Sequence, residues 1–216
     1  MKFMYKSLVI AMATLMVQSH VFAAKPKTIN DQVKKGSGSA VTTSNRVEVN
    51  RPEVARIVKA MQNLNLKTIS PEAVAKITNL EALRIFEEIV KAPAIVEVAK
   101  NGQLSEIDLS RAIDTLTKTG ATLGSQSTAE MSDGLEVVQT GLSLSLLSAE
   151  KLKEFDMDPK VVDRFRSLLE KEAETAFNPN LLAQAVHSQL RQEGKVSMTF
   201  KEWVEAMKNC LKSLKG

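Results

Sequence analysis

Side chains suited to metal or nucleophilic chemistry are scarce in this chain of 216 residues, which has two histidines, His20 and His187, and one cysteine, Cys210. A zinc site built on His and Cys needs three or four such ligands. His187 lies in the apolar-rich segment LLAQAVHSQL, with no nearby turn of the kind that presents a catalytic serine. We therefore expect His187 to be a structural histidine on a helix.

Cys210 follows Val204 and Met207 and precedes Leu211 and Leu214 at helical spacing. A single cysteine cannot form a disulfide within the chain, so the fold must rely on its hydrophobic core. This pattern predicts a small buried apolar side chain. An intermolecular disulfide through Cys210 is the alternative.

Three short motifs contain the groups that a serine hydrolase uses. Ser148-Ala-Glu-Lys151, Lys118-Thr119-Gly120 and Ser132-Asp133-Gly134 resemble the nucleophile motif and the two other elements of penicillin-binding enzymes. In that family the nucleophile comes first and the Lys-Thr-Gly element lies late on a strand. Here the Lys-Thr-Gly element comes first and ends a predicted helix, so caps and loops are the favoured interpretation and a cell-envelope hydrolase is an alternative.

Two loops resemble part of a calcium-binding EF-hand. GQLSEIDL places Gly102 at the sharp turn, Leu104 at the position that pairs with a partner loop, and Asp108 at the final carboxylate; GKVS at 194–197 repeats the beginning of this pattern. The resemblance implies that calcium, if bound, is held by Glu97, Asn101, Ser105 and Asp108. Ala99 departs from the pattern because it cannot ligate, and Arg191 places a cation among the ligands of the second loop.

The same residues of the first loop also have a purely structural interpretation, which we favour. Gly102 ends one helix in the left-handed region, Ser105 caps the next, and Asp108 is the acid of a capping box. A third possibility is a metal-free EF-hand-like scaffold in which the loops pair through Leu104 and Val196. No cofactor is expected under the structural interpretation.

Other catalytic patterns are weak. GATLGSQS at 120–127 lacks the lysine of a phosphate-binding loop. Several acidic residues lie in predicted helices beside Lys or Arg, which is typical of solvated helix faces. These residues are Glu87, Glu88, Glu170, Glu172 and Glu174.

The first 23 residues have the layout of a secretory signal peptide. Lys2 and Lys6 precede an apolar run over 8–17, and Val21-Phe22-Ala23 comes before the expected cleavage site. The run is about 10 residues long, whereas a membrane-spanning helix needs about 20. We expect a periplasmic or secreted protein that begins at Ala24 and has no transmembrane anchor.

The charge of the expected mature chain is nearly balanced. Without Lys2 and Lys6 the 29 basic residues fall to 27 against 25 acidic ones, and residues 51–216 have 22 basic and 23 acidic side chains. Aromatic residues make up 4% of the chain. A nucleic-acid binder needs a basic surface and often aromatic stacking platforms, so we expect no nucleic-acid partner.

Spacing of apolar residues predicts an all-α protein. Residues 24–50, with GSGSAVTTSN at 36–45, have no apolar periodicity and are predicted to be a flexible tether. In residues 51–216 apolar side chains recur at helical spacing, which predicts a compact bundle of about nine helices, with room for two EF-hand-like helix–loop–helix pairs and at most a token strand pair. The small residues of 117–133 mark the expected subdomain hinge.

Local signals refine this expectation. Asn50 is a predicted cap of the first helix, and one long helix is predicted from Ser70 to the interruption at Pro93. Gly134 and Gly141 are one heptad apart on a helix and should permit close contact with neighbouring helices.

No reaction follows from this pattern of residues. The favoured hypothesis is an exported, non-enzymatic helical protein that binds another macromolecule through a helix groove or an exposed apolar face. We expect this partner to be a protein. An EF-hand-like calcium-responsive module and a cell-envelope hydrolase are the alternatives.

Overall fold

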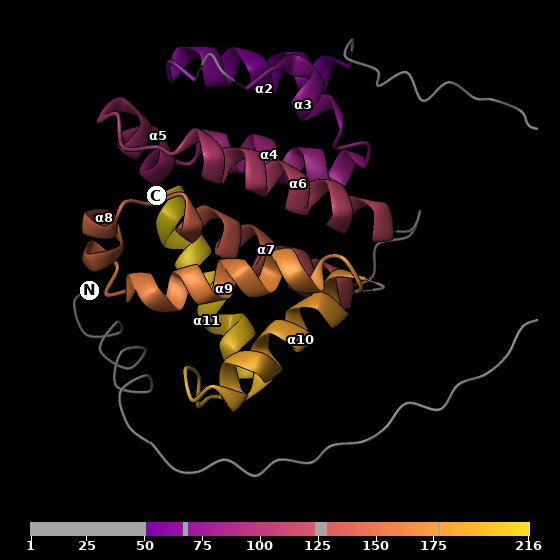
Figure 1. The fold of residues 1–216 in the computed structure, drawn as a ribbon, viewed down its shortest axis with the longest axis vertical. Helices are drawn as coiled ribbons and strands as arrows, with labels where there is room; N and C mark the ends of the chain where they lie inside the picture. The colour runs from indigo at the N-terminus through magenta and orange to yellow at the C-terminus, as the bar shows by residue number, and fades with distance from the viewer. Residues whose placement is uncertain (1–50, 67–68, 124–128, 177) are drawn as a thin grey trace, which may run out of the picture.

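The computed structural model describes residues 51–66, 69–123, 129–176 and 178–216. This part of the chain forms ten α-helices and contains no strand (Figure 1). The helices are α2 (Pro52–Asn63), α3 (Pro71–Ala75), α4 (Leu80–Lys91), α5 (Pro93–Lys100), α6 (Glu106–Thr122), α7 (Ala129–Ser145), α8 (Ala149–Glu154), α9 (Pro159–Glu172), α10 (Pro179–Gln192) and α11 (Phe200–Lys215). The predicted all-α bundle is confirmed, with ten helices in the described residues where about nine were expected. The predicted signal peptide and tether lie outside the described residues.

The helices stack in successive layers (Figure 1). α2 and α3 lie at one end of the molecule, and α2 packs on α4, which in turn packs on α6. α4 also contacts α7, α6 contacts α9, and α5 contacts α11, so the helices before and after the 117–133 segment share one interface. The opposite end is formed by α10 and the first turns of α11.

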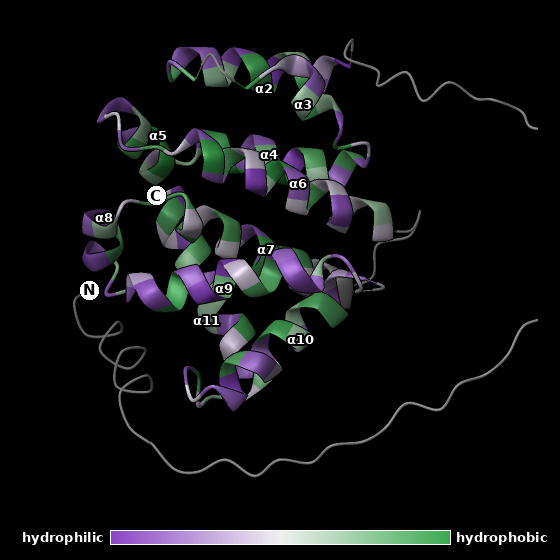
Figure 2. Cartoon of the chain, in the orientation of Figure 1, coloured by the Kyte–Doolittle hydropathy of each residue, from purple (hydrophilic) through white to green (hydrophobic). Residues whose placement is uncertain are grey.

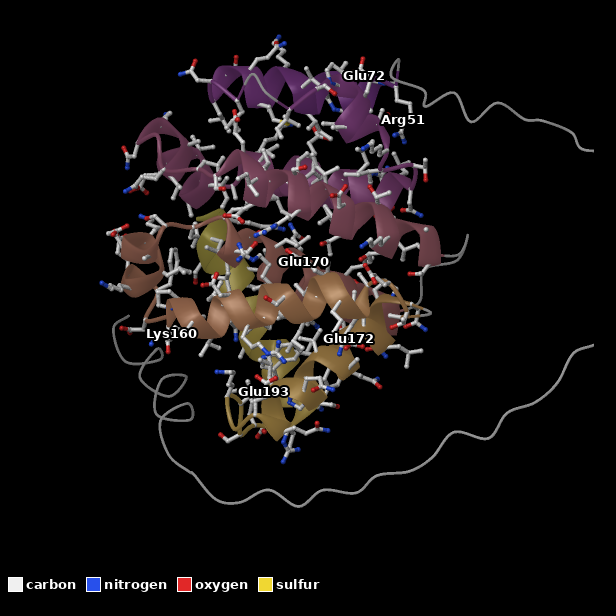
Figure 3. The ribbon with its side chains drawn as sticks, viewed as in Figure 1. Arg51, Glu72, Lys160, Glu170, Glu172 and Glu193 are labelled. Atoms are coloured by element: carbon white, nitrogen blue, oxygen red, sulfur yellow. The ribbon has the colours of Figure 1, made fainter. Side chains whose placement is uncertain are left out.

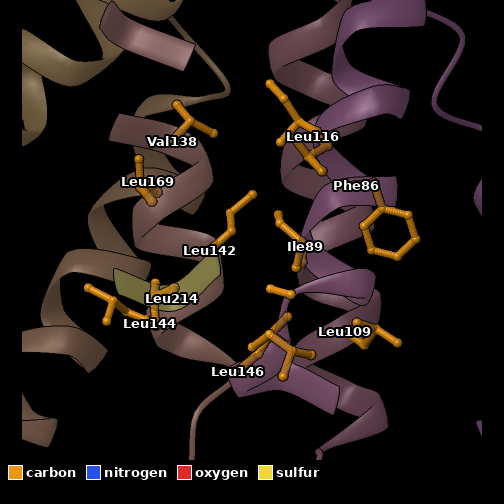
Figure 4. Packing of buried hydrophobic residues seen from close by; sticks show 14 of the residues in the cluster. Phe86, Ile89, Leu109, Leu116, Val138, Leu142, Leu144, Leu146, Leu169 and Leu214 are labelled. Carbon is orange, nitrogen blue, oxygen red and sulfur yellow. The ribbon is translucent and has the colours of Figure 1, made fainter. Parts of the chain in front are cut away.

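α7 packs against four helices, α4, α9, α10 and α11. Every residue from Gly134 to Leu144 is buried except Glu136, because neighbouring helices surround this part of α7. Figure 4 shows the Leu142 side chain of α7 directed toward Ile89 of α4. Thr140 remains satisfied in this core because its hydroxyl donates to the Glu136 carbonyl at 2.7 Å. Apolar and polar residues alternate along the ribbons of the other helices (Figure 2), and the buried apolar residues of these helices join the same core.

Two glycines allow α7 to approach its neighbours closely, as predicted. A Cβ at Gly134 would lie 2.4 Å from the Pro179 carbonyl carbon at the start of α10. A Cβ at Gly141 would lie 2.6 Å from Leu169 Cδ1 and 2.8 Å from Phe165 Cζ, both on α9. Real Cβ atoms do not come this close to other heavy atoms, so glycine is required for both contacts.

The prediction of a single helix from Ser70 to Pro93 is wrong, because α3 and α4 are separate. The Asn79 side chain accepts hydrogen bonds from the amides of Glu81 at 2.9 Å and Ala82 at 3.2 Å, and so starts a new helix. Ser70 caps α3 by accepting from the Ala73 amide. This local competition for backbone groups ends α3 after five residues.

Arg51 fixes the turn between α3 and α4. Its guanidinium donates to the carbonyls of Ala75 at 3.1 Å, Ile77 at 2.6 Å and Thr78 at 3.0 Å (Figure 3 labels Arg51 beside α3). Arg51 is also the N-cap of α2, without a side-chain cap. Asn50, the predicted cap, lies outside the described residues.

The expected hinge over 117–133 is largely helical in the described residues. α6 continues through Gly120 to Thr122, and α7 begins at Ala129. Gly120 was expected to end its helix, but it lies within the last turn, where an added Cβ would come 2.9 Å from Asn79 Cβ. Only Leu123 is described between the two helices, and 124–128 lie outside the described residues.

Candidate functional site

A shallow, open depression lies between α2, α4 and the last turn of α11, with a volume of about 630 Å³. We call this surface the charged depression. Four cations line it, Arg56, Arg84, Lys91 and Lys215. Two carboxylates, Glu87 and Glu88, and the backbone turn at Ala92 and Pro93 complete the lining.

Glu87 is the central anion of the charged depression. Arg56 on α2 donates to it through Nε at 3.1 Å and Nη2 at 3.3 Å, and Lys91 donates through Nζ at 2.6 Å. Hydrogen bonds from Arg56 lower the pKa of Glu87, and those from Lys91 add to this effect against the opposing influence of burial. Glu87 is therefore ionised, and it ties α2 to α4 at the floor of the depression.

Glu88 links α4 to the end of α11. Its Oε2 atom accepts from Lys215 Nζ at 2.7 Å and from Gln139 Nε2 of α7 at 2.9 Å. Burial raises the pKa of Glu88, but the two hydrogen bonds outweigh burial and hold the pKa below its ordinary value. The charged depression thus depends on the correct seating of α11 against α4 and α7.

The four cations are more accessible than the central carboxylate. Side-chain exposure is 52% for Arg56 and Lys91, 57% for Arg84 and 42% for Lys215, whereas it is 14% for Glu87. Glu87 therefore lies deeper, and the rim has the four cations and one carboxylate, Glu88, which is 53% exposed. Such an arrangement can exchange internal ion pairs for contacts with an anionic ligand.

The residues expected to bind calcium are used as helix caps and ion-pair partners. Gly102 has a φ of 68°, and the amides of Gly102 and Gln103 donate to the carbonyls of Ala99 and Val98, which is the Schellman pattern at the end of a helix. Ser105 caps α6 by accepting from the Asp108 amide at 3.2 Å. These hydrogen bonds agree with the structural interpretation, in which Gly102 ends one helix and Ser105 caps the next.

The carboxylates of the calcium hypothesis face cations. Asp108 Oδ1 lies 2.6 Å from Arg166 Nη1 on α9 and 3.3 Å from Arg111 Nη1, so this carboxylate is not turned back as a capping-box acid. Glu97 lies 2.7 Å from Lys151 Nζ. Asn101 is the exposed C-cap of α5.

Nor do the two loops form the paired scaffold suggested as a third possibility. Gly194 repeats the helix-ending geometry of Gly102, with a φ of 67°. Leu104 and Val196 are in no strand or bridge. In Figure 1 the α5–α6 connection and the α10–α11 connection lie at different ends of the molecule. Across the described ranges, His, Cys, Asp and Glu do not gather in groups of three or more that could hold a metal ion.

The hydrolase-like motifs do not converge. Ser148 caps α8 by accepting from the Lys151 amide, and Lys151 Nζ lies 2.7 Å from Glu154. Thr119 is buried in α6, where its hydroxyl donates to the Thr115 carbonyl at 2.9 Å. Ser132 is near the start of α7 whereas Ser148 follows its end, so α7 separates them by roughly 20 Å at 1.5 Å per residue.

His187 is a structural histidine in an aromatic cluster, as predicted. Its Nε2–H donates to the Met198 carbonyl at 3.0 Å, and its ring lies 5.2 Å from Trp203 and 5.5 Å from Phe200. Burial lowers the pKa of His187, with a smaller contribution from Arg191 in the same direction, while the bond to Met198 opposes it. The side chain is therefore neutral at pH 7.

Protonation of His187 should destabilise the fold. Because its folded pKa lies below the unfolded value near 6.5, its stabilising contribution is complete above that value and is lost as the pH falls toward the folded pKa. Urea unfolding at about pH 7 and pH 5.5 should therefore give a larger loss of stability for the wild type than for His187→Gln. Equal losses in the two proteins would contradict a depressed pKa.

Cys210 is buried among the residues of α11 and its neighbours, as predicted, and is 6% exposed. Burial raises the pKa of its thiol to about 11. The thiolate is the form that exchanges with disulfides, so this environment makes Cys210 unreactive at neutral pH.

Large apolar side chains that are exposed are few in the described residues, and they do not form the apolar docking face that was one of the expected partner sites. Large hydrophobic residues that are exposed in the described part of the chain are Leu80 on α4, Ile107 on α6 and Leu181 on α10. They lie on three different helices. The surface that brings several helices together is instead the charged depression, which the sequence did not predict.

No known family model, curated protein or solved structure matches the chain. Among the described residues, no helix has both the length and the apolarity needed to cross a bilayer.

Proposed function

We propose that this protein is an exported, non-enzymatic helical protein that binds a protein partner. The observation that supports the proposal is the charged depression, where charged side chains from α2, α4 and α11 meet on one concave surface. Its cations are about half exposed, and Arg84 and Lys215 are paired with carboxylates that are also about half exposed. Such surface ion pairs are weak and exchange readily. Surfaces of this kind select partners by charge and speed their encounter.

The groups suited to catalysis have other roles, which also favours binding. Ser148 and Ser105 cap helices, His187 is neutral within the aromatic cluster, and the Cys210 thiol is buried. The predicted signal peptide supports export, and the predicted tether over 24–50 would extend the reach of the chain beyond the helical domain.

Site-specific photo-crosslinking in the native host tests this proposal. A photoreactive residue is introduced singly at exposed positions on different helices: Glu72 on α3, Arg84 on α4, Lys118 on α6, Lys160 on α9 and Gln192 on α10. We expect the same protein adduct at a subset of these positions, since a specific interface covers only part of the surface. No adduct at any position would contradict the proposal.

A further inference from the structure

We propose that the charged depression is the docking site for an extended, acidic segment of the protein partner. This inference rests on the proposed function and assigns the site and the chemistry of the ligand. Residues from the first and last described helices take part, since Arg56 comes from α2 and Lys215 from the last turn of α11. Binding at this surface therefore depends on the complete helical domain.

The distribution of charge selects an acidic ligand. Four cations and two carboxylates line the depression. Glu87 is deep, at 14% exposed, whereas Glu88 is 53% exposed, so the accessible charges are four cations and one carboxylate. An incoming carboxylate meets Arg84 and Lys91 first, at a rim with net positive charge. Charge-assisted hydrogen bonds from a guanidinium or an ammonium to a carboxylate are shorter and stronger than neutral ones.

Existing contacts of the rim cations leave them available to a ligand. Arg84 contacts Glu81 one turn earlier on the same helix, at 2.8 Å, and both side chains are more than half exposed. Lys91 contacts Glu87 four residues earlier. Pairs at this spacing on a helix surface contribute little to stability, so either cation can turn to a ligand at small cost.

The mixed lining favours a peptide over other anions. A peptide backbone carries N–H donors, which Glu87 and Glu88 can accept, while acidic side chains of the same peptide bind the rim cations. Phosphate polymers offer acceptors alone and would meet two carboxylates without a donor. A bilayer surface is flat and cannot enter a concave site, so the peptide is the occupant that satisfies both signs of charge.

The extended form follows from the shape of the site. The depression is shallow and open, and it runs over the Ala92–Pro93 turn between α4 and α5. Ala92 has an extended backbone, with φ −60° and ψ 131°, and its side chain is small. A strand-like peptide can lie across this turn without displacing a large side chain.

Fluorescence anisotropy of the purified protein tests the inference with a labelled peptide of alternating Glu and Gly, about twelve residues or roughly 40 Å long when extended. The double variant Arg84→Gln/Lys91→Gln should bind the peptide about fivefold or more weakly than the wild type. A matched control, Lys160→Gln/Lys171→Gln, removes the same charge from exposed positions on α9 and should bind like the wild type. Circular dichroism verifies that both variants are folded.

Four outcomes would overturn the inference: no binding of the acidic peptide, equal weakening in the α9 control, tighter binding of inorganic polyphosphate, or tighter binding of vesicles rich in phosphatidylglycerol. Failure of the inference and failure of the proposed function are distinguishable. Adducts that form in the host at Lys118, Lys160 or Gln192 but not at Arg84 would disprove this docking site, but they would still support the proposal that the protein binds a protein partner. Absence of adducts at every position would remove the partner itself.

Discussion

Replacing Gly134 by alanine should lower the free energy of unfolding by about 3 kcal/mol, which corresponds to a fall in Tm of roughly 6 to 12 °C for a domain of this size. The new Cβ would lie 2.4 Å from the Pro179 carbonyl carbon and 2.5 Å from the Asn180 nitrogen. Both atoms belong to the backbone, so no side-chain rotation relieves the overlap and α10 must move away from α7. Urea and thermal unfolding followed by circular dichroism measure the effect.

The expected loss of stability in Gly134→Ala is opposite in sign to the usual effect of replacing glycine by alanine in a helix. In the interior of an exposed helix, alanine is more stable than glycine by about 1 kcal/mol. A matched control is Ser132→Ala, an exposed position two residues earlier on the same helix, which should be neutral or slightly stabilising. If Gly134→Ala were as stable as the wild type, α7 and α10 would not pack as closely as described.

Close packing at the two glycines was predictable because the signal is local. Gly134 and Gly141 occur within an apolar stripe, one heptad apart, and small residues at such positions let helices approach. The identity of the facing helices was not predictable, since Pro179 lies 45 positions after Gly134 in the sequence. Contacts across that separation are set by how all the apolar faces are buried together.

Helix starts were predicted well where proline or a capping side chain marks them. Ser70 and Ser148 each accept from a backbone amide at the start of a helix, as predicted, and Asp158 and Asn178 do the same directly before a proline. The break between α3 and α4 was missed because an apolar stripe continues through it. Buried Ile77 lies outside both helices, and Arg51, whose guanidinium holds the break, is 26 residues away.

The charged depression could not be predicted for a similar reason. Arg56 and Glu87 are 31 residues apart, and Glu88 and Lys215 are 127 residues apart. Each of these residues also has charged neighbours on its own helix, so the sequence indicates only solvated helix faces. What joins them is the packing of α2 on α4 and of α11 on α7 beside α4, which is a property of the whole bundle.

Trp203→Ala should be the most destabilising single substitution of a side chain in α11, with a loss of about 3 to 5 kcal/mol. Trp203 is 2% exposed, and its ring lies 5.5 Å from Phe165 of α9 in an edge-on arrangement and 5.2 Å from His187 of α10. Removing it leaves a cavity where three helices meet. Unfolding is followed by circular dichroism, since Trp203 is the only tryptophan, and Trp203→Phe, which keeps an aromatic ring, should lose less stability.

The same substitution should also weaken the effect of acid on stability. Trp203 covers one side of the His187 ring, and burial is the main cause of the lowered pKa of His187. Opening that side to water lets the folded-state pKa rise toward its unfolded value near 6.5, which narrows the range over which His187 makes stability depend on pH. Trp203→Ala should therefore lose less stability than the wild type between about pH 7 and pH 5.5. An unchanged loss in that range would mean that other groups, and not Trp203, keep water from His187.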